Sequence, residues 1–474
     1  MTSNRPESPP AYTLSYGFGP DGQPHVVVDG GRRSLHNHYH VGDETITRAF
    51  GALLSPELAD LVDVALAVYV ADRLCPRRHR EASAYDLNWT RRFYIRVPLR
   101  NPELWSQSSV TRALKQLLWF LTEDKWSFEF VPRTRGPRST EIQAGLFPMN
   151  PASPVTAALF SGGLDSLAGL CAELADSQRD TFVLFAGSTN TEARAVQRRL
   201  IAEVRARFGR EVILVTVPFG LRDRAPGQHD ESTQRSRGFV FMALGAVTAI
   251  EAGARGLAIY ENGVGAINLP YTDGQLGAHS TRSVHPAALA AMADLVTLVT
   301  GRDFAFRLPF LFHTKGQVCA RLADAGLGSL GSTANSCDGF PQRVPGHPHC
   351  GRCTSCLLRR QALWAARLHE VDRDTHYIHD VLGDLARVPD RRLHKWRAML
   401  HQVARLQGAL NQDSPWRALS REYPQLVEVA AGEIATAMAS SGAEERLVDL
   451  YRRYCDEWAR FPAALRSPLL KHTA

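Results

Sequence analysis

The string from Ser161 to Ser166, Ser-Gly-Gly-Leu-Asp-Ser, holds the residue types best suited to chemistry in this chain. It lies between an apolar stretch that predicts a strand and a pattern that predicts a helix from Asp165 onward. Two glycines permit a tight turn with its backbone N–H groups directed outward, and a helix N-terminus favours negative charge. With the two serine hydroxyls, these groups predict a phosphate-binding turn.

Asp165 fits such a turn less easily, because a carboxylate repels phosphate unless a cation lies between them. An Mg²⁺ ion that bridges Asp165 and a nucleotide would remove this conflict. The alternative is a Gly-Gly turn that opens an ordinary helix, which a bare Ser-Gly-Gly would favour. The full string after an apolar strand is more specific and favours a nucleotide.

Four cysteines, Cys337, Cys350, Cys353 and Cys356, form the pattern Cys-x12-Cys-x2-Cys-x2-Cys. The two short spacings place three sulfurs around one point, and the upstream sulfur completes a tetrahedron, as in structural Zn²⁺ sites. Gly351 permits the tight turn between them. An iron–sulfur cluster could use the same thiolates, whereas disulfides are disfavoured in a cytoplasmic protein.

Histidines occur at two further places where a metal could bind. His347 and His349 lie in the long spacer of the cysteine pattern, and we interpret them as flexible loop residues rather than replacement ligands. His36, His38 and His40 alternate as in a strand. Without a carboxylate or cysteine nearby, this group is interpreted as a chance cluster.

The glycine-rich string and the cysteine pattern, in this order, resemble the QueC (7-cyano-7-deazaguanine synthase) family of PP-loop ATP pyrophosphatases over roughly residues 153–365. The string resembles the PP-loop, and the cysteines followed by Leu-Leu-Arg359 resemble the zinc site that ends the family's catalytic domain. The segments Ser236-Arg237-Gly238 and His313-Thr314-Lys315 also match family elements in order. The resemblance implies that ATP is cleaved to AMP and pyrophosphate, with ATP, Mg²⁺ and Zn²⁺ as cofactors.

Candidate site residues follow from the resemblance and from the predicted fold. Nucleotide binding is expected at Ser161, Gly162, Gly163, Leu164, Asp165, Ser166, Ala186 and Gly187. Catalysis is expected from Asp165, Lys315, Arg237 and Glu261, with Lys315 and Arg237 placing positive charge near leaving pyrophosphate. The polar loop between Glu261 and Pro286 is expected to bind the second substrate through Glu261, Asn262, Asn268, Ser280, Thr281, Arg282 and His285. A passive surface loop is the alternative.

The hydrophobic pattern of the central region predicts an α/β fold. Strands at 155–160, 181–186, 212–217 and 257–260 alternate with helices at 165–176, 191–207, 236–253 and 286–299. This alternation predicts a parallel sheet with covering helices, which the resemblance specifies as a PP-loop (HUP-like, Rossmann-type) fold. Ligands of such sheets bind at the carboxyl ends of the strands. Ala186 and Gly187, at the end of the second strand, are therefore expected near the adenine.

The flanking regions extend beyond the resemblance, and domains are predicted at 1–150, 151–365 and 366–474. The first is expected to be an α+β domain for docking a partner or substrate, with strands at 24–28, 92–97 and 126–131 and helices at 58–74 and 111–121. The last reads as amphipathic helices, and its stripe of Leu393, Trp396 and Leu400 is interpreted as buried core.

Composition sets wider bounds on the protein. Of the 474 residues, 44% are hydrophobic and 22% charged, as is typical of globular proteins. The longest charge-free apolar run, residues 238–250, is too short to span a bilayer, and residues 1–10 have no apolar core of a signal peptide. We expect a cytoplasmic protein. The net charge of +7 is spread along the chain, so a nucleic-acid partner is not indicated.

The Glu261-Asn-Gly loop and the string at residues 280–286 resemble the long QueC-like proteins of bacterial antiphage operons, such as QatC and the QueC-like component of type IV CBASS. This resemblance implies that the enzyme adenylates 7-carboxy-7-deazaguanine and transfers it to an amine. The expected acceptor is the N-terminus of a protein from the same operon. One alternative is synthesis of 7-cyano-7-deazaguanine with ammonia, and another is a non-catalytic defence scaffold that binds nucleotide.

Overall fold

Ten strands form one sheet in the described part of this computed structural model, in the order β10-β9-β6-β7-β8-β3-β2-β1-β4-β5. The structure describes residues 11–19, 24–29, 34–77, 90–134, 137–145, 154–177, 181–188, 190–223, 225, 231, 233–271, 282–340, 344, 346, 348–380, 389–438 and 442–462. The strands are β1 (Ala11–Phe18), β2 (Pro24–Asp29), β3 (Ser34–Val41), β4 (Arg92–Leu99), β5 (Lys125–Pro132), β6 (Val155–Leu159), β7 (Thr181–Ser188), β8 (Glu211–Asp223), β9 (Gly256–Ile259) and β10 (Ala305–Arg307).

Strands β6 to β10 form a parallel half-sheet in which all neighbouring strands run in the same direction. Numbered along the chain, these five strands lie in the order 3-2-1-4-5, which is the order of doubly wound nucleotide-binding sheets. The four strands predicted in this region are all present. The short β10 was not predicted, because a three-residue strand is too short to show a periodic signal.

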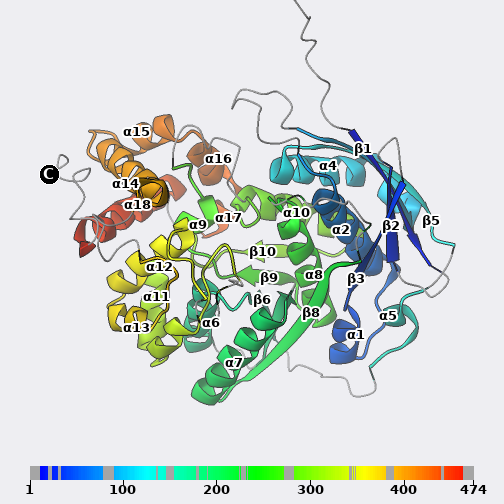
Figure 1. The fold of residues 1–474 in the computed structure, drawn as a ribbon, viewed down its shortest axis with the longest axis horizontal. Helices are drawn as coiled ribbons and strands as arrows, with labels where there is room; N and C mark the ends of the chain where they lie inside the picture. Colours follow the sequence, from blue (N-terminus) through cyan, green and yellow to red (C-terminus); the bar gives the residue numbers. More distant parts are fainter. Residues whose placement is uncertain are drawn as a thin grey trace, which may run out of the picture.

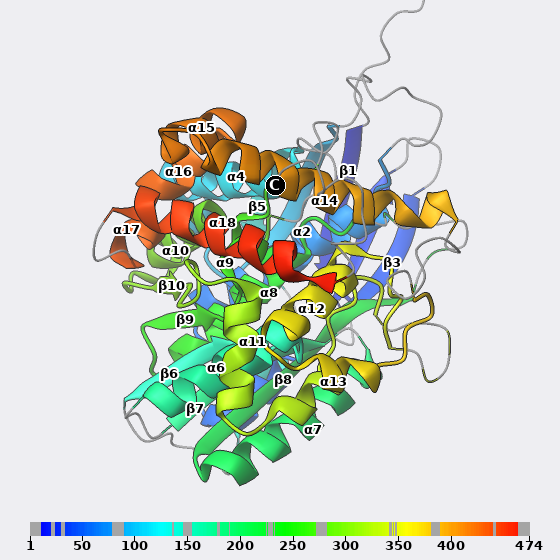
Figure 2. The same cartoon turned by 90° about the vertical axis from the view of Figure 1, so that its left-hand side faces the viewer.

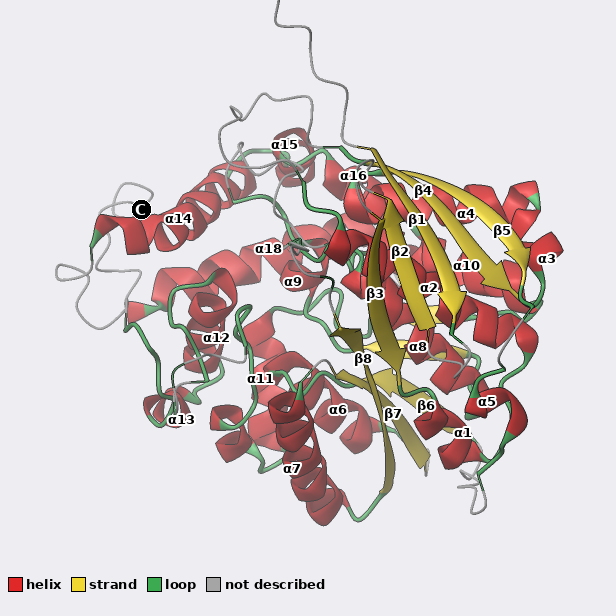
Figure 3. Ribbon diagram, turned by 45° about the vertical axis from the view of Figure 1, so that its right-hand side comes forward, coloured by secondary structure: helices red, strands yellow, loops and turns green. Residues whose placement is uncertain are grey.

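Strand β8 joins this half-sheet to the N-terminal strands. Its first part pairs parallel with β7, and its last residues, from Phe219 to Asp223, pair antiparallel with β3. The predicted strands at 24–28, 92–97 and 126–131 correspond to β2, β4 and β5. One continuous sheet therefore spans the first two predicted domains (Figure 3). Their separation and the docking role of the first stay predictions.

Helices cover the sheet and form the C-terminal part of the chain (Figure 1). They are α1 (Glu44–Phe50), α2 (Pro56–Leu74), α3 (Pro102–Ser106), α4 (Ser108–Thr122), α5 (Ser139–Ile142), α6 (Leu164–Asp176), α7 (Thr191–Phe208), α8 (Arg237–Glu251), α9 (Gly263–Ile267), α10 (Pro286–Thr300), α11 (Lys315–Asp324), the 3-10 helix η3 (Gly328–Ser332), α12 (Thr354–Ala365), α13 (His369–Arg373), α14 (Asp390–Leu410), α15 (Pro415–Glu422), α16 (Gln425–Ala431), α17 (Glu433–Met438) and α18 (Ala443–Arg460). The predicted helices of the central region and the helical C-terminal region are confirmed.

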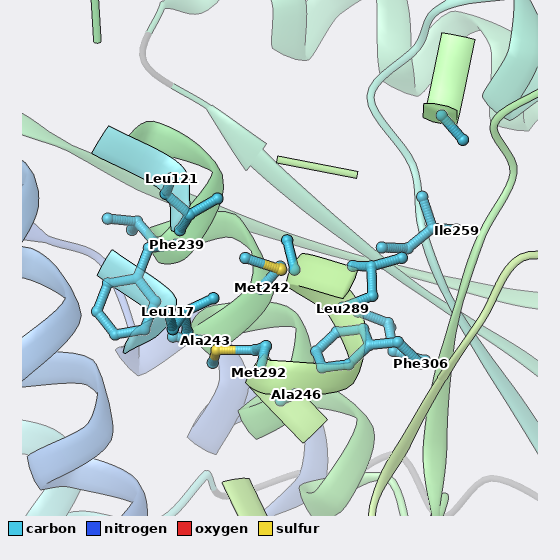
Figure 4. Close-up of a cluster of buried hydrophobic side chains, with 14 of the residues drawn as sticks. Leu117, Leu121, Phe239, Met242, Ala243, Ala246, Ile259, Leu289, Met292 and Phe306 are labelled. Atoms are coloured by element: carbon cyan, nitrogen blue, oxygen red, sulfur yellow. The ribbon is translucent and has the colours of Figure 1, made fainter. Parts of the chain in front are cut away.

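Two apolar layers hold the helices against the parallel strands. Phe182 and Leu184 of β7 belong to the core beneath α6 and α7, whereas Val183 and Phe185 belong to the core beneath α8. This alternation follows from the two-residue period of a strand. The second core also includes helix α4, whose Leu117 and Leu121 lie in one cluster with residues of α8, α10, β9 and β10 (Figure 4). Apolar burial thus attaches the N-terminal helices to the central sheet.

The C-terminal helices pack around a core of aromatic side chains. The rings of Trp396 in α14 and Trp458 in α18 lie 5.6 Å apart, and both side chains are buried. The predicted stripe of Leu393, Trp396 and Leu400 is buried as expected. This bundle also reaches the central domain, because α18 contacts both α9 and α12 (Figure 2).

Candidate functional site

Residues 161–166, here named the glycine loop, connect β6 to α6. Gly162 has a φ of +79°, in the left-handed region that favours glycine. The Ser161 hydroxyl accepts a hydrogen bond from the N–H of Gly163 at 3.2 Å, and the Ser166 hydroxyl donates to the carbonyl of Gly163 at 2.9 Å. Leu164 is buried in the core, so only its backbone faces the loop's surroundings. The sequence thus forms a compact turn at a helix N-terminus.

The glycine loop follows β6, the strand at which the order of strand addition in the sheet reverses. From β6 the chain continues to β7 on one side, whereas β9 borders β6 on the other. Residues after β6 and after β9 therefore emerge at the same carboxyl edge, which is where ligands bind in sheets of this kind. Asp165 follows the first strand, and Glu261 and Asn262 follow the second.

Four polar side chains meet at this edge, and we name Asp165, Glu261, Asn262 and Lys315 the acid–lysine cluster. The Asn262 amide donates to Asp165 Oδ1 at 3.0 Å and to Glu261 Oε1 at 2.8 Å. The Lys315 ammonium donates to Asp165 Oδ2. Only 8% of the Lys315 side chain and 13% of the Asp165 side chain are exposed. The predicted catalytic residues Asp165, Glu261 and Lys315 are thus neighbours.

Local helix signals hold the members of this cluster. Asn262 is the N-cap of α9, and its Oδ1 accepts from the N–H of Gly265 at 3.0 Å. Lys315 is the first residue of α11, after the N-cap Thr314, which forms a capping box with Gln317. Two helix starts, far apart in sequence, therefore fix the amide and the ammonium around Asp165.

The charges of the cluster do not balance. Burial and the neighbouring Asp165 carboxylate raise the pKa of Glu261 to about 8. Burial opposes the ammonium charge of Lys315, but the Asp165 and Glu261 carboxylates outweigh this effect and raise its pKa. Two carboxylates thus share one ammonium. The excess of acidic groups suits the binding of a proton or a further cation.

The other predicted nucleotide residues lie at the end of β7. Ala186 and Gly187 are buried there, and a Cβ on Gly187 would lie 2.6 Å from the ring of Phe241. The guanidinium of Arg237 lies over the same ring, 5.3 Å from its centroid. This places the predicted catalytic Arg237 beside the end of β7, whereas Lys315 lies beside Asp165, past the carboxyl end of β6.

Two predicted substrate residues contact the N-terminal helix α4. Arg282 forms an ion pair with Glu123 at 3.2 Å, and its guanidinium lies over Phe120. His285 caps α10, accepting from the N–H of Ala287 at 3.2 Å, and its ring lies 5.3 Å from Phe120. Burial and the nearby Arg282 lower the pKa of His285 to about 4. These contacts attach the loop's end to α4.

The remaining predictions for this loop concern Asn268, Ser280 and Thr281. Asn268 ends α9 with a φ of +50°, and Ser280 and Thr281 lie outside the described residues. Further along, the amide of Gln402 in α14 donates to the carbonyls of Leu269 and Pro270 at 2.9 and 3.1 Å. The C-terminal bundle thus holds the start of the segment that was expected to bind substrate.

The four predicted metal ligands come together. The sulfurs of Cys337, Cys350, Cys353 and Cys356, here named the cysteine cluster, all lie within 4.8 Å of one another. Tetrahedral zinc with sulfur at about 2.3 Å requires sulfur separations of nearly 4 Å, so the arrangement can hold such an ion. Gly351, with a φ of +75°, makes the turn between two of the ligands.

Backbone N–H groups point at these sulfurs. The N–H of Cys353 donates to Cys350 Sγ at 3.4 Å, and that of Cys356 donates to Cys353 Sγ at 3.3 Å. Such bonds favour thiolates and fix their orientation. No other group of three or more potential ligands is found in the described residues, and the His36, His38 and His40 side chains do not form one.

The interpretation of His349 as a flexible loop residue is wrong. Its side chain is fully buried, and Nε2 accepts from the N–H of Ser336 at 3.3 Å. Burial lowers the pKa of His349 to about 3, so the ring packs as a neutral acceptor. His347 lies outside the described residues.

Sequence reasoning missed three residues that support the site. The Gln197 amide donates to the carbonyl of Ser161 at 3.2 Å, and the N–H of Asn335 donates to the carbonyl of Gly162 at 3.0 Å. Glu457 of α18 accepts from the Thr314 hydroxyl beside Lys315. Asn335 lies two residues before Cys337, and this position next to a predicted metal ligand was a signal that it supports the site. Gln197 and Glu457 lie on amphipathic helices, where polar residues usually face solvent.

Comparison with known proteins adds no relative to this description. No protein-family model and no curated protein matched the chain. A search of the described helices for a membrane span found none of sufficient length and apolar character.

Proposed function

We propose that the chain is an ATP-dependent ligase that adenylates a carboxylic acid and transfers the acyl group to an amine. The observation that carries this proposal is the convergence of Asp165, Asn262 and Lys315 beside the glycine loop, at the carboxyl edge between β6 and β9. A phosphate-binding turn, a buried ammonium and an excess of carboxylates are the groups that such a reaction requires.

The proposed reaction has two steps. A carboxylate oxygen of the acid attacks the α-phosphorus of ATP, the bond to the bridging oxygen breaks, and pyrophosphate leaves. The amine nitrogen then attacks the activated carbonyl carbon, AMP leaves with the former carboxylate oxygen, and the nitrogen loses a proton. The Lys315 ammonium would counter the negative charge that develops on the phosphates. Glu261, with a pKa near 8, could accept the released proton.

The residues present suit the cofactors expected from the sequence. An Mg²⁺ ion, when bound, would supply positive charge between Asp165 and the phosphates, and the surplus carboxylate of Glu261 fits such a cation. The cysteine cluster offers four sulfurs and no other ligand type, as structural Zn²⁺ sites do. An iron–sulfur cluster is the alternative occupant, and metal analysis distinguishes the two.

The state of Cys319 favours amine transfer over sulfur insertion. Cys319 lies one turn beyond Lys315, but its thiol is fully buried, and burial raises its pKa to about 12. A nucleophilic sulfur requires an accessible thiolate. The family resemblance narrows the acid to 7-carboxy-7-deazaguanine and the acceptor to a protein N-terminus in antiphage defence, with ammonia as the alternative nitrogen donor.

The first test measures pyrophosphate release with ATP, Mg²⁺ and 7-carboxy-7-deazaguanine. Release should depend on the acid, and it should fall by at least about 100-fold in Asp165→Asn, which removes the carboxylate expected to hold Mg²⁺ beside the phosphates. Asp176→Asn is the matched control, because Asp176 is an exposed aspartate at the other end of α6. Mass spectrometry of small molecules and of co-purified protein would identify the acceptor.

The competing hypothesis is a scaffold that binds nucleotide without chemistry. Such a protein should retain its partner binding in Asp165→Asn, and wild type should release no pyrophosphate with any acid offered. Loss of release in Asp165→Asn, with nucleotide binding retained, would exclude the scaffold and support the ligase.

A further inference from the structure

Helix α18 runs past both halves of the acid–lysine cluster. A Cβ on Gly263, at the start of α9, would lie 2.7 Å from Leu450. The Arg453 guanidinium donates to the carbonyl of Phe312 at 3.1 Å, and Glu457 accepts from the hydroxyl of Thr314. Positions 450, 453 and 457 share one face of a helix. The C-terminal helix therefore contacts the segments that carry Asn262 and Lys315 (Figure 2).

The contact at Glu457 is the most specific of the three. Its side chain is 7% exposed, and its second oxygen accepts from the Gln361 amide at 3.1 Å. Gly316 leaves room for this carboxylate, because a Cβ there would lie 2.7 Å from Glu457 Oε1. The carboxylate thus lies at the N-terminus of α11, where the helix dipole favours negative charge.

We propose that Glu457 is a positioning residue that fixes the first turn of α11 and thereby holds the Lys315 ammonium against Asp165. The Thr314 hydroxyl both caps α11, accepting from the N–H of Gln317 at 3.1 Å, and donates to Glu457. Loss of the carboxylate frees this hydroxyl to rotate and leaves a void beside Gly316. Lys315 follows Thr314 directly, so its ammonium loses its fixed distance to Asp165.

This inference rests on the proposed function for its catalytic consequence, but not for its structural one. It makes the C-terminal bundle part of the site: residues 151–365 carry the acid–lysine cluster, and α18 holds it. A ligase that consists of 151–365 alone would lack this support.

Substitutions at position 457 in the full chain separate geometry from charge. Glu457→Ala removes both hydrogen-bond acceptors. Glu457→Gln keeps an acceptor for Thr314, and its amide can donate to Gln361 after that side chain turns, because Gln361 Oε1 is a buried oxygen without a hydrogen-bond partner. The Gln variant should therefore position Lys315 nearly as wild type does. Asp456→Ala is the matched control, since Asp456 is exposed on the same helix.

The first readout is the rate at which an amine-acylating reagent modifies Lys315, followed by peptide mass spectrometry. Exposed Lys115 serves as the internal reference for reagent activity. We expect modification of Lys315 to be about tenfold faster in Glu457→Ala, because its protection depends on local order, and unchanged in Glu457→Gln and Asp456→Ala. Buried Cys171 should stay protected from a thiol reagent in every variant, which shows that the fold is intact.

The second readout is kcat/KM for pyrophosphate release, expected to fall about 100-fold in Glu457→Ala and to be largely restored in Glu457→Gln. Wild-type modification rates at Lys315 in Glu457→Ala would overturn the inference, as would a Gln variant as impaired as the Ala variant. If wild type releases no pyrophosphate while Glu457→Ala still exposes Lys315, the proposed function fails and the positioning role stands. Should Glu457→Ala not fold, Thr314→Val against Thr314→Ser tests the same contact.

Discussion

The backbone N–H of Asn335 donates a 3.0 Å hydrogen bond to the carbonyl oxygen of Gly162. The side chain of Asn335 accepts from the N–H of Cys337, also at 3.0 Å. One residue thus connects the glycine loop to the backbone of Cys337, the first residue of the cysteine cluster. Because a bound metal orders its ligands, the order of the loop should depend on the metal.

Removal of the metal should therefore loosen the glycine loop. We expect Cys353→Ser or strong chelation to speed hydrogen exchange in peptides over residues 160–166, while the core strand β7 stays protected. Metal analysis by mass spectrometry would give the identity and stoichiometry of the ion. Cys455→Ala, a buried cysteine outside the cluster, is the control. If the metal is lost and hydrogen exchange in residues 160–166 does not change, then Asn335 does not couple the order of the glycine loop to metal binding.

Substitution of Gly162 tests the loop's geometry directly. Gly162→Ala requires a left-handed backbone, and its Cβ would lie 3.1 Å from Gln197 Cγ, whose amide holds the Ser161 carbonyl. We expect a loss of about 1–2 kcal/mol in the free energy of unfolding, with weaker nucleotide binding. Gly209→Ala is the matched control, since its φ is +60° and its Cβ would meet open space. Equal nucleotide affinity in the two variants would contradict this role for the loop.

Features that depend on nearby residues, namely the central strands and helices and the cysteine cluster, could be predicted from the sequence. Most central strands and helices appear close to their expected bounds because apolar runs and helix ends are local features, as at the Asn190 cap and the Gly209 end of α7. The strand expected at 212–217 is the exception, because β8 continues to Asp223, where it pairs with β3. The cysteine cluster followed from spacing alone. Lys315 and Asp165, in contrast, meet across 150 residues, and only the resemblance had suggested that both belong to the site.

Loop composition was a poorer guide to contacts. Arg282 and His285 were expected to bind substrate, but both contact Phe120 of α4, Arg282 also pairs with Glu123 at the end of that helix, and His285 caps α10. An arginine and a histidine in a polar loop look the same in sequence whether they face a ligand or another helix. Whether such residues face a ligand or a helix depends on how the N-terminal strands join the sheet through β8. That pairing connects residues far apart in the sequence, so local patterns do not reveal it.

Loss of the Lys315 charge should lower the free energy of unfolding more than loss of the Asp165 charge. Lys315→Met leaves Asp165 and Glu261 without a cation, and removal of one partner from a buried pair typically costs about 3–5 kcal/mol. Asp165→Asn should cost less, because Lys315 keeps Glu261 as a partner and position 165 can still accept from Asn262. Urea unfolding at neutral pH measures both. A larger loss for Asp165→Asn would contradict the proposed charge balance.

Glu261 gives the cluster a signature in the pH dependence of stability. Its pKa is about 8 in the folded protein, against an ordinary value of 4.5, so the folded state binds more protons between these values. The free energy of unfolding should therefore fall as pH rises from about 5 to 8, by an amount that disappears in Glu261→Gln. The glutamine retains an oxygen that can accept from Asn262, so the comparison isolates the charge.

Two further comparisons separate the effects of burial and of Asp165 on this pH dependence of the free energy of unfolding. Asp165→Asn removes the neighbouring carboxylate that helps to raise the pKa of Glu261, so the fall in stability should shrink without vanishing, because burial remains. Added Mg²⁺ should reduce it as well if the ion binds beside these carboxylates, since a cation favours the ionised acid. A wild-type slope identical to that of Glu261→Gln would show that the pKa of Glu261 is not raised in the folded protein, which would contradict the proposed proximity of two carboxylates in a buried cluster.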